Sequence, residues 1–248
     1  MLLDIAGLRK SFGSIVVADD LDISIAPGEA VGIIGPNGAG KTTLFNLIAG
    51  GLAADGGAIH FEGRDVTRLP PQARCRAGIG RTHQIPQPFE KLTVFENLLV
   101  GAVHGRGKIA RETTERQKTE REAAQSCAEI LARLDLLKHA NTLAGALTLL
   151  QRKRLEMARA LATHPRLLLL DEIAGGLIEA ECAELVDTIG DIRRSGVAIL
   201  WIEHVVHALL AVVDRLVVLN FGRKIAEGVP RDVMASPEVR QIYIGIEA

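Results

Sequence analysis

A glycine-rich segment between an apolar run and a helical pattern constrains this chain more than any other feature. It matches the pattern G-x-x-x-x-G-K-[ST] and adds one threonine: Gly35, Pro36, Asn37, Gly38, Ala39, Gly40, Lys41, Thr42 and Thr43. Residues 30–34 predict a buried strand and residues 43–49 a helix, so the segment is expected to bind phosphate through inward-turned N–H groups and the positive helix end. Lys41 would reach the outer phosphates, and Thr42 would ligate magnesium. The alternative, an ordinary glycine-rich turn, is disfavoured because every fixed position of the motif is filled.

The overall charge disfavours a nucleic-acid partner. The 248 residues carry a formal net charge of -1, whereas proteins that bind nucleic acid usually present a basic face. Cys75, Cys127 and Cys182 are widely spaced, so they predict neither a disulfide framework nor a zinc site and indicate a reducing cytosol.

The sequence predicts neither a signal peptide nor a membrane span. The first residues include Asp4 and lack a continuous apolar region. The most apolar stretch, residues 205–221, contains His207 and the pair Asp214-Arg215, which disfavour a span. Any contact with a membrane is therefore expected to go through a partner.

Two kinds of apolar pattern predict a mixed α/β fold. Residues 15–25 and 57–62 alternate in the way of antiparallel or edge strands. Residues 167–170 and 197–202 are unbroken apolar runs, typical of parallel strands covered on both faces. Residues 179–194 between these runs predict a crossover helix.

The charged stretch at residues 109–138 also predicts a helix. Its apolar side would be formed by Cys127, Ile130, Leu131, Leu134 and Leu137. Residues 106–122 mix positive and negative charges, and we interpret them as a solvated helix or a mobile arm. A surface for docking a partner is the alternative.

Two carboxylates follow the apolar run 167–170, where Asp171 and Glu172 stand at the end of the predicted strand. Open parallel sheets bind ligands at the carboxyl ends of their strands. Asp171 is therefore the expected magnesium partner. Glu172 is placed to orient or deprotonate a water that attacks the terminal phosphate. Downstream of a phosphate loop, this pair is typical of P-loop ATPases.

Further segments carry a family resemblance: Arg81-Thr82-His83-Gln84, Leu92-Thr93-Val94-Phe95-Glu96-Asn97, residues 154–161, residues 221–228 and Ile242-Tyr243-Ile244-Gly245. With the phosphate loop, they make the chain resemble the ATP-binding subunits of ABC transporters, most closely the branched-chain amino acid type, over nearly its whole length. The resemblance implies an α/β P-loop NTPase fold with a RecA-like core, an N-terminal antiparallel β subdomain and an inserted α-helical subdomain. Residues 1–248 would form one domain, with its core at about 1–92 and 149–248 and its helical subdomain at about 93–148.

The resemblance also implies a function. The chain would hydrolyse ATP with Mg²⁺ and power the uptake of branched-chain or related amino acids at the cytoplasmic face of the plasma membrane. Two ATP-binding subunits would pair head to tail, with integral membrane permease subunits and, indirectly, a substrate-binding protein. A soluble ABC protein acting on DNA or ribosomes is less favoured, because such proteins commonly carry two ATPase domains or long insertions.

Three further residue roles follow from the resemblance. Gln84 corresponds to the glutamine that senses magnesium and water and links to the membrane subunits, and His204 to the switch histidine on the terminal phosphate. A surface or capping histidine, or a less favoured metal site with His207, is the alternative for His204. Phe12 stands where the family places an aromatic that stacks on adenine; a core residue at a strand end is the alternative.

Departures from the family pattern cluster in the parts offered to a partner. Leu147-Thr148-Leu149-Leu150-Gln151 stands where the signature reads Leu-Ser-Gly-Gly-Gln or Leu-Ser-Tyr-Gly-Gln. Because Leu150 replaces a glycine, its side chain is expected to hinder close approach to phosphate. Ile173 stands where the family usually has Pro, and Ile178 stands where it has Asp or Asn. Val205, after the switch histidine, stands where it commonly has Asp. A homodimer is therefore expected to hydrolyse ATP slowly, and a heterodimer with an intact partner is the easier interpretation. A subunit that binds ATP with little hydrolysis of its own is the alternative.

Overall fold

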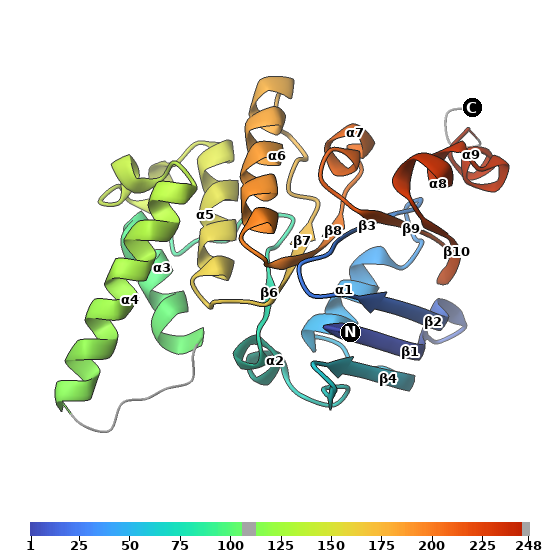
Figure 1. Cartoon of the computed structure of the whole chain (residues 1–248), viewed down its shortest axis with the longest axis horizontal. Coiled ribbons are helices and arrows are strands. Elements are labelled where there is room, and N and C mark those ends of the chain that lie inside the picture. Colours follow the sequence, from blue (N-terminus) through green and yellow to red (C-terminus); the bar gives the residue numbers. More distant parts are fainter. Residues whose placement is uncertain (106–112, 245–248) are drawn as a thin grey trace.

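Two β-sheets and the helix between them frame the molecule (Figure 1). The computed structural model describes residues 1–105 and 113–244. The larger sheet has the strand order β10-β9-β3-β8-β7-β6, and the smaller one has the order β2-β1-β4-β5. The strands are β1 Leu3–Phe12, β2 Ile15–Ile25, β3 Ala30–Ile34, β4 Gly56–Phe61, β5 Arg64–Asp65, β6 Ile79–Arg81, β7 Leu167–Asp171, β8 Ala198–Ile202, β9 Arg215–Asn220 and β10 Arg223–Gly228.

The central strands of the larger sheet are parallel and have helices on both faces (Figure 1). Helix α1 (Lys41–Ala49) lies on the side of the smaller sheet, whereas α5 (Leu149–Leu161), α6 (Glu179–Arg194) and α7 (Val206–Leu210) lie on the other. Helix α6 connects β7 to β8, which confirms the predicted crossover helix. The predicted mixed α/β class, with antiparallel and parallel parts, is also confirmed.

Successive residues of β7 belong to different apolar clusters. Leu167 and Leu169 pack with α1 and the smaller sheet, while Leu168 and Leu170 pack with the helices of the opposite face. Side chains of a strand alternate between faces, so a strand covered on both faces needs apolar residues at every position. This explains the unbroken leucine run before Asp171 and fixes the carboxylate at the end of a rigid strand.

Three helices pack together at one end of the molecule: α3 (Val94–Gly105), α4 (Thr113–Arg133) and α5. The short 3₁₀ helices η1 (Leu137–His139) and η2 (Ala144–Ala146) connect α4 to α5. Part of the predicted charged arm, residues 106–112, lies outside the described residues. Of the predicted apolar side, the buried members are Cys127, Leu131 and Leu134, and Ile130 is partly buried. The prediction for Leu137 was wrong, because α4 ends at Arg133 and Leu137 is 50% exposed.

The remaining helices are α2 (Pro71–Ala77), α8 (Pro230–Ala235) and α9 (Pro237–Ile244). Each begins with a proline, whose fixed φ suits the first helical position, where an N–H has no intrahelical partner. None of the helices in the described part of the chain combines the length and hydropathy needed to cross a bilayer.

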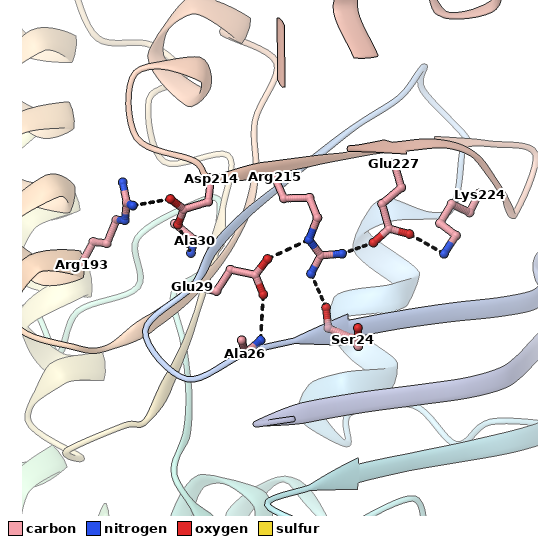
Figure 2. A network of polar contacts seen from close by, with 9 residues as sticks. All are labelled: Ser24, Ala26, Glu29, Ala30, Arg193, Asp214, Arg215, Lys224 and Glu227. Atoms are coloured by element: carbon pink, nitrogen blue, oxygen red, sulfur yellow. Dashed lines mark hydrogen bonds and ion pairs between the residues drawn. The ribbon is translucent and has the colours of Figure 1, made fainter. Parts of the chain in front are cut away.

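Arg215, at the start of β9, ties the two sheets together (Figure 2). Its guanidinium donates to the Glu29 carboxylate at 2.7 Å and to the Ser24 carbonyl on β2, and it also pairs with Glu227 on β10. Burial on its own would raise the pKa of Glu29, but the hydrogen bonds from Arg215 and from the Ala26 N–H, with the charge of Arg215, hold it below its ordinary value of 4.5. The network thus fixes β2 against the strand that lies beside β3.

Candidate functional site

The predicted phosphate loop runs from the end of β3 to the start of α1 and borders a cavity of about 230 Å³. Gly38 and Gly40 adopt positive φ angles of 82° and 98°. A Cβ at Gly40 would lie 2.2 Å from the carbonyl oxygen of Val17, so only glycine fits there. Nothing lies within 4 Å of a Cβ built at Gly38. The loop is therefore held against β2 on one side and leaves its backbone open on the other.

Lys41 lies at the centre of this loop. The residue is 6% exposed, and its ammonium donates to the carbonyls of Gly35 at 2.7 Å and Pro36 at 3.1 Å. Burial lowers the pKa of Lys41, while the negative charges of Glu172 and Asp171 act in the opposite direction. Phosphate oxygens are stronger acceptors than carbonyls, so a phosphate entering the loop would draw the ammonium toward itself.

Asp171 is held by Arg81, for which the sequence predicted no role beyond its place in the segment Arg81-Thr82-His83-Gln84. The two side chains form an ion pair of 2.9 Å between Nη2 and Oδ2. Arg81 ends β6, the strand beside β7, and also donates to Asn46 of α1 at 2.6 Å. One guanidinium therefore connects the strand of Asp171, the strand that leads to Gln84 and the helix of the phosphate loop. This role depends on β6 lying beside β7, which no local sequence pattern reveals.

Glu172 brings the other predicted catalytic side chains together. Its Oε1 lies 2.7 Å from His204 Nε2, and its Oε2 accepts a hydrogen bond from the Gln84 amide nitrogen at 2.5 Å. Glu172 has a positive φ of 47°, which is uncommon for a non-glycine residue and clusters at functional sites. It also lines the phosphate-loop cavity. Three residues from three separate segments thus meet beside the phosphate loop.

The donors assigned to magnesium fit that ion, which prefers oxygen ligands. Thr42, whose side chain bears a hydroxyl, lines the loop cavity. The ion pair of Asp171 uses only Oδ2, which leaves Oδ1 for a metal. Gln84 contacts Glu172 through its nitrogen, which leaves its oxygen for a metal. The alternative metal site at His204 and His207 lacks support, because no group of three or more His, Cys, Asp and Glu residues gathers in the described ranges.

Phe12 ends β1 with its ring half exposed, so the alternative of a core residue is wrong. The Lys10 ammonium lies 5.4 Å from the ring centroid. Val17, on the strand that pairs with β1, lines the phosphate-loop cavity. The hairpin that carries Phe12 therefore borders the loop, as a base-stacking role requires.

The sequence pattern of ABC transporters matches residues 18–175. The chain belongs to the ABC transporter family. This ABC ATPase is 37% identical to the high-affinity branched-chain amino acid transport ATP-binding protein LivG of Escherichia coli K12, over 98% of each chain. It is 36% identical to BraF of Pseudomonas aeruginosa, which has the same description, over 98% of each chain. It is also 35% identical to the lipopolysaccharide export system ATP-binding protein LptB of Acidithiobacillus ferridurans, over 98% of this chain and 97% of that protein.

Solved structures lead to the same family. A nucleotide-free ATP-binding cassette from an ABC transporter superposes with a TM-score of 0.87 at 34% identity, over 98% of this chain and 99% of that chain. An ADP conformation of an ATP-binding cassette gives 0.86 at 34% identity, over 98% of each chain. The predicted P-loop fold and ATPase class are thereby confirmed, and the chain is a nucleotide-binding protein.

The signature segment of this ABC ATPase closes the N-terminus of α5. The Thr148 hydroxyl accepts from the Gln151 N–H at 3.4 Å, and the Gln151 side-chain oxygen accepts from the Thr148 N–H at 3.0 Å. This capping box satisfies two N–H groups that the helix leaves without intrahelical partners.

The prediction that the Leu150 side chain hinders phosphate was wrong. Leu150 is only 8% exposed and belongs to the core beneath α5. Leu149, in contrast, is 43% exposed and borders a cavity of about 320 Å³ together with Gln84 and Glu172. The helical turn points consecutive residues in different directions, so the exposed bulk beside the catalytic residues belongs to Leu149.

The other departures also divide between core and surface. Ile173 is buried, and Val205 borders the same cavity as Leu149. Ile178 is 67% exposed directly before α6, where its N–H donates to the Glu181 carboxylate at 3.1 Å. Leu149 stands where the family pattern has glycine or tyrosine, and Ile178 stands where it has Asp or Asn. Both are apolar residues on the surface of this ABC ATPase.

Proposed function

We propose that this ABC ATPase hydrolyses MgATP, with Glu172 orienting or deprotonating the attacking water. The observation that carries the proposal is the double contact of Glu172 with His204, at 2.7 Å, and with Gln84, at 2.5 Å, beside the phosphate loop. The phosphates of ATP would lie against Lys41 and the backbone N–H groups of the loop. The adenine would stack on Phe12.

The proposed reaction needs little from the protein beyond positioning and charge. Attack of water on the terminal phosphate spreads negative charge over its oxygens and the leaving ADP. Lys41 would provide a fixed positive charge there, His204 would donate a hydrogen bond to the terminal phosphate, and Glu172 would accept a proton from the water. Magnesium held by Thr42, Gln84 and Asp171 would neutralise phosphate charge.

We further propose that the chain pairs head to tail with a second ATP-binding subunit that carries an intact signature. In such a pair each nucleotide lies between the phosphate loop of one chain and the signature of the other. The support is the contrast between the open loop around Gly38 and the self-capped, leucine-bearing start of α5. A homodimer would combine two good loops with two poor signatures.

Permease subunits are proposed to dock beside the Gln84 segment. A cavity of about 330 Å³ lies between this segment and helices α3 and α5, and its lining includes His83, Phe89, Glu156 and Arg159. The Arg159 guanidinium lies 5.0 Å from the Phe89 ring centroid and pairs with Glu156 at 2.9 Å. Residues 93–148 would act as the helical subdomain that follows the permease. This contact would hold the chain at the cytoplasmic face of the plasma membrane.

The proposed cargo is a branched-chain or related amino acid, delivered by a substrate-binding protein and imported. Its support is the 37% identity to LivG and the 36% identity to BraF. The export protein LptB is 35% identical, so uptake itself has to be measured with the complete transporter.

A subunit that binds ATP and scarcely hydrolyses it is the second candidate. Leu149 and Ile178 favour it, because both are exposed aliphatic residues, where the family pattern has glycine or tyrosine and Asp or Asn, respectively.

The test is steady-state MgATP hydrolysis by the purified chain, alone and with a partner ATP-binding subunit, with Glu172→Gln as the blank. Binding of a fluorescent ATP analogue is measured in parallel. Turnover above the blank only with the partner is the expected result. Turnover by the chain alone would contradict the heterodimer proposal, binding without turnover under both conditions would favour the second candidate, and absence of binding would refute both.

A further inference from the structure

Glu203 connects the two backbone segments that carry the proposed hydrolytic residues. It precedes His204 at the end of β8 and is only 2% exposed. Its carboxylate accepts hydrogen bonds from the N–H groups of Ala174 at 3.0 Å, His204 at 3.0 Å and Val205 at 3.4 Å. Ala174 follows Glu172 closely in the chain. One buried carboxylate therefore holds the backbone behind Glu172 and the backbone of His204 together.

Burial of a carboxylate costs free energy, which hydrogen-bond donors and a nearby positive charge both offset. Lys153 of α5 is the cation at hand. It is 4% exposed and lines the 320 Å³ cavity with Glu203, Glu172 and His204. Lys153 makes no hydrogen bond or ion pair of 4 Å or less within the described part of the chain. Its ammonium and the carboxylates of Glu203 and Glu172 line the same cavity and attract each other over a longer distance. Burial lowers the pKa of Lys153, and the charges of Glu203 and Glu172 oppose that change.

Neighbouring charges on α5 have partners elsewhere. Glu156 pairs with Arg159 at 2.9 Å, and Arg154 pairs with Glu184 at 2.8 Å. The charged or titratable groups that share the cavity with Lys153 are Glu172, Glu203 and His204. Lys153 is thus the one lysine or arginine among the described residues that line this cavity.

We propose that Lys153 is a positioning residue for ATP hydrolysis, which acts through Glu203 to hold the segments of Glu172 and His204 in their catalytic arrangement. This inference rests on the proposed function. Helix α5, which carries Lys153, begins at Leu149, which lines the same cavity as Glu172 and His204.

Loss of Lys153 has a defined consequence. Without the ammonium, the buried Glu203 carboxylate has only its N–H donors to offset the cost of burial, and it is expected to turn toward water. This movement weakens its acceptance of the Ala174 and His204 N–H groups. The phosphate loop keeps its own hydrogen bonds, in which the Lys41 ammonium donates to the carbonyls of Gly35 and Pro36.

Amide hydrogen exchange of the full-length chain tests the positioning without nucleotide. In Lys153→Met, peptides covering residues 172–176 and 202–206 are expected to exchange at least about tenfold faster than in the wild type, while residues 35–43 do not change. Lys153→Arg retains the charge and is expected to restore slow exchange. Lys138→Met is the matched control, because Lys138 is an exposed lysine that pairs with Asp135 at 3.3 Å.

Kinetics with the partner subunit provide the second measurement. Lys153→Met is expected to lower kcat at least about tenfold while ATP affinity stays within about twofold of the wild type. A merely structural role would lower both together. Lys153→Arg is expected to recover most of kcat.

Unchanged exchange in Lys153→Met would overturn the proposal. Faster exchange that includes the phosphate loop to the same extent, or failure of Lys153→Arg to restore the wild-type pattern, would overturn it as well. If the wild type shows no hydrolysis above the Glu172→Gln blank, the proposed function fails separately, and the exchange experiment still decides whether Lys153 holds the two segments.

Discussion

The N-termini of helices α1 and α5 differ in whether a side chain caps them. Gly40 precedes α1 without a side-chain cap, and the first turn contains no acidic residue. Thr148 precedes α5 and closes it with a capping box. An uncapped helix start offers unsatisfied N–H groups to an anion, whereas a capped start has already used part of them. The chain therefore leaves the N–H groups at the start of α1 free for a phosphate, and it satisfies N–H groups at the start of α5 with its own side chains.

The open helix start depends on packing for its stability. Leu44 and Phe45 of α1 are fully buried between the two sheets, so apolar contacts hold the helix without a cap. At α5, Leu150 is buried in a comparable way, but Leu149 is partly exposed and lines a cavity with Gln84 and Glu172. The phosphate loop and the signature segment should therefore respond differently to substitution.

The largest effect is expected at the loop end of the site. Glu172→Gln should lower MgATP hydrolysis in the presence of the partner by about 10²-fold or more, the lower range for loss of a general base. ATP affinity should not fall, because the loop and Lys41 are retained. Glu122→Gln, at an exposed position of α4, is the control and should behave like the wild type. An equal loss in both variants would show that Glu172 has no special role.

Substitutions of Leu149 and Leu150 should differ in their effect on the free energy of unfolding. Leu150→Ala should lower the free energy of unfolding by about 3 kcal/mol, because it removes a buried side chain from the core. Leu149→Ala should change it by less than about 1 kcal/mol, since that side chain is largely at the surface. Urea unfolding of the two variants provides the measurement.

The same pair also tests the cause of the closed signature. If the exposed side chain of Leu149 limits ATP hydrolysis by a homodimer, Leu149→Gly should raise hydrolysis by the chain alone, whereas Leu150→Ala should not. A similar destabilisation in both Ala variants would contradict the inward and outward placement of the two leucines.

Loss of the cap on α5 should have a smaller effect. Thr148→Ala should cost about 1 kcal/mol of unfolding free energy, the usual value for an N-cap residue, and Thr148→Ser should retain most of it. Both variants can be compared by urea unfolding. If Thr148→Ala were as stable as the wild type, the capping box would not be what closes this helix end.

The smallest effect concerns pH and the Arg215 network that holds β2 beside the loop. Because the pKa of Glu29 lies below its ordinary value of 4.5, its stabilising contribution is complete above that pH and is lost as the pH falls through the lowered pKa. The difference in unfolding free energy between wild type and Glu29→Gln should therefore be constant near neutral pH, at less than about 1 kcal/mol. It should shrink below pH 4.5. A difference that does not depend on pH would contradict the role of the carboxylate charge.

Features that depend on residues close together in the chain could be predicted from the sequence. The phosphate loop at residues 35–43, the leucine run before Asp171 and the helix Glu179–Arg194 could be predicted because glycine conformation, apolar periodicity and strand-end position are local properties. The resemblance added Gln84 and His204, and the structure brings both onto Glu172.

Contacts between side chains that are far apart in the sequence, and the exposed side of each helix, depend on tertiary packing. The ion pair of Arg81 with Asp171 requires β6 and β7 to be neighbours, and the cavity shared by Lys153 and Glu203 requires α5 to lie against the end of β8. Leu149 and Leu150 have the same chemistry and adjacent positions, and only packing distinguishes them. The free energy of a buried charge or a buried methyl group depends on what surrounds it, and a linear sequence does not contain those surroundings.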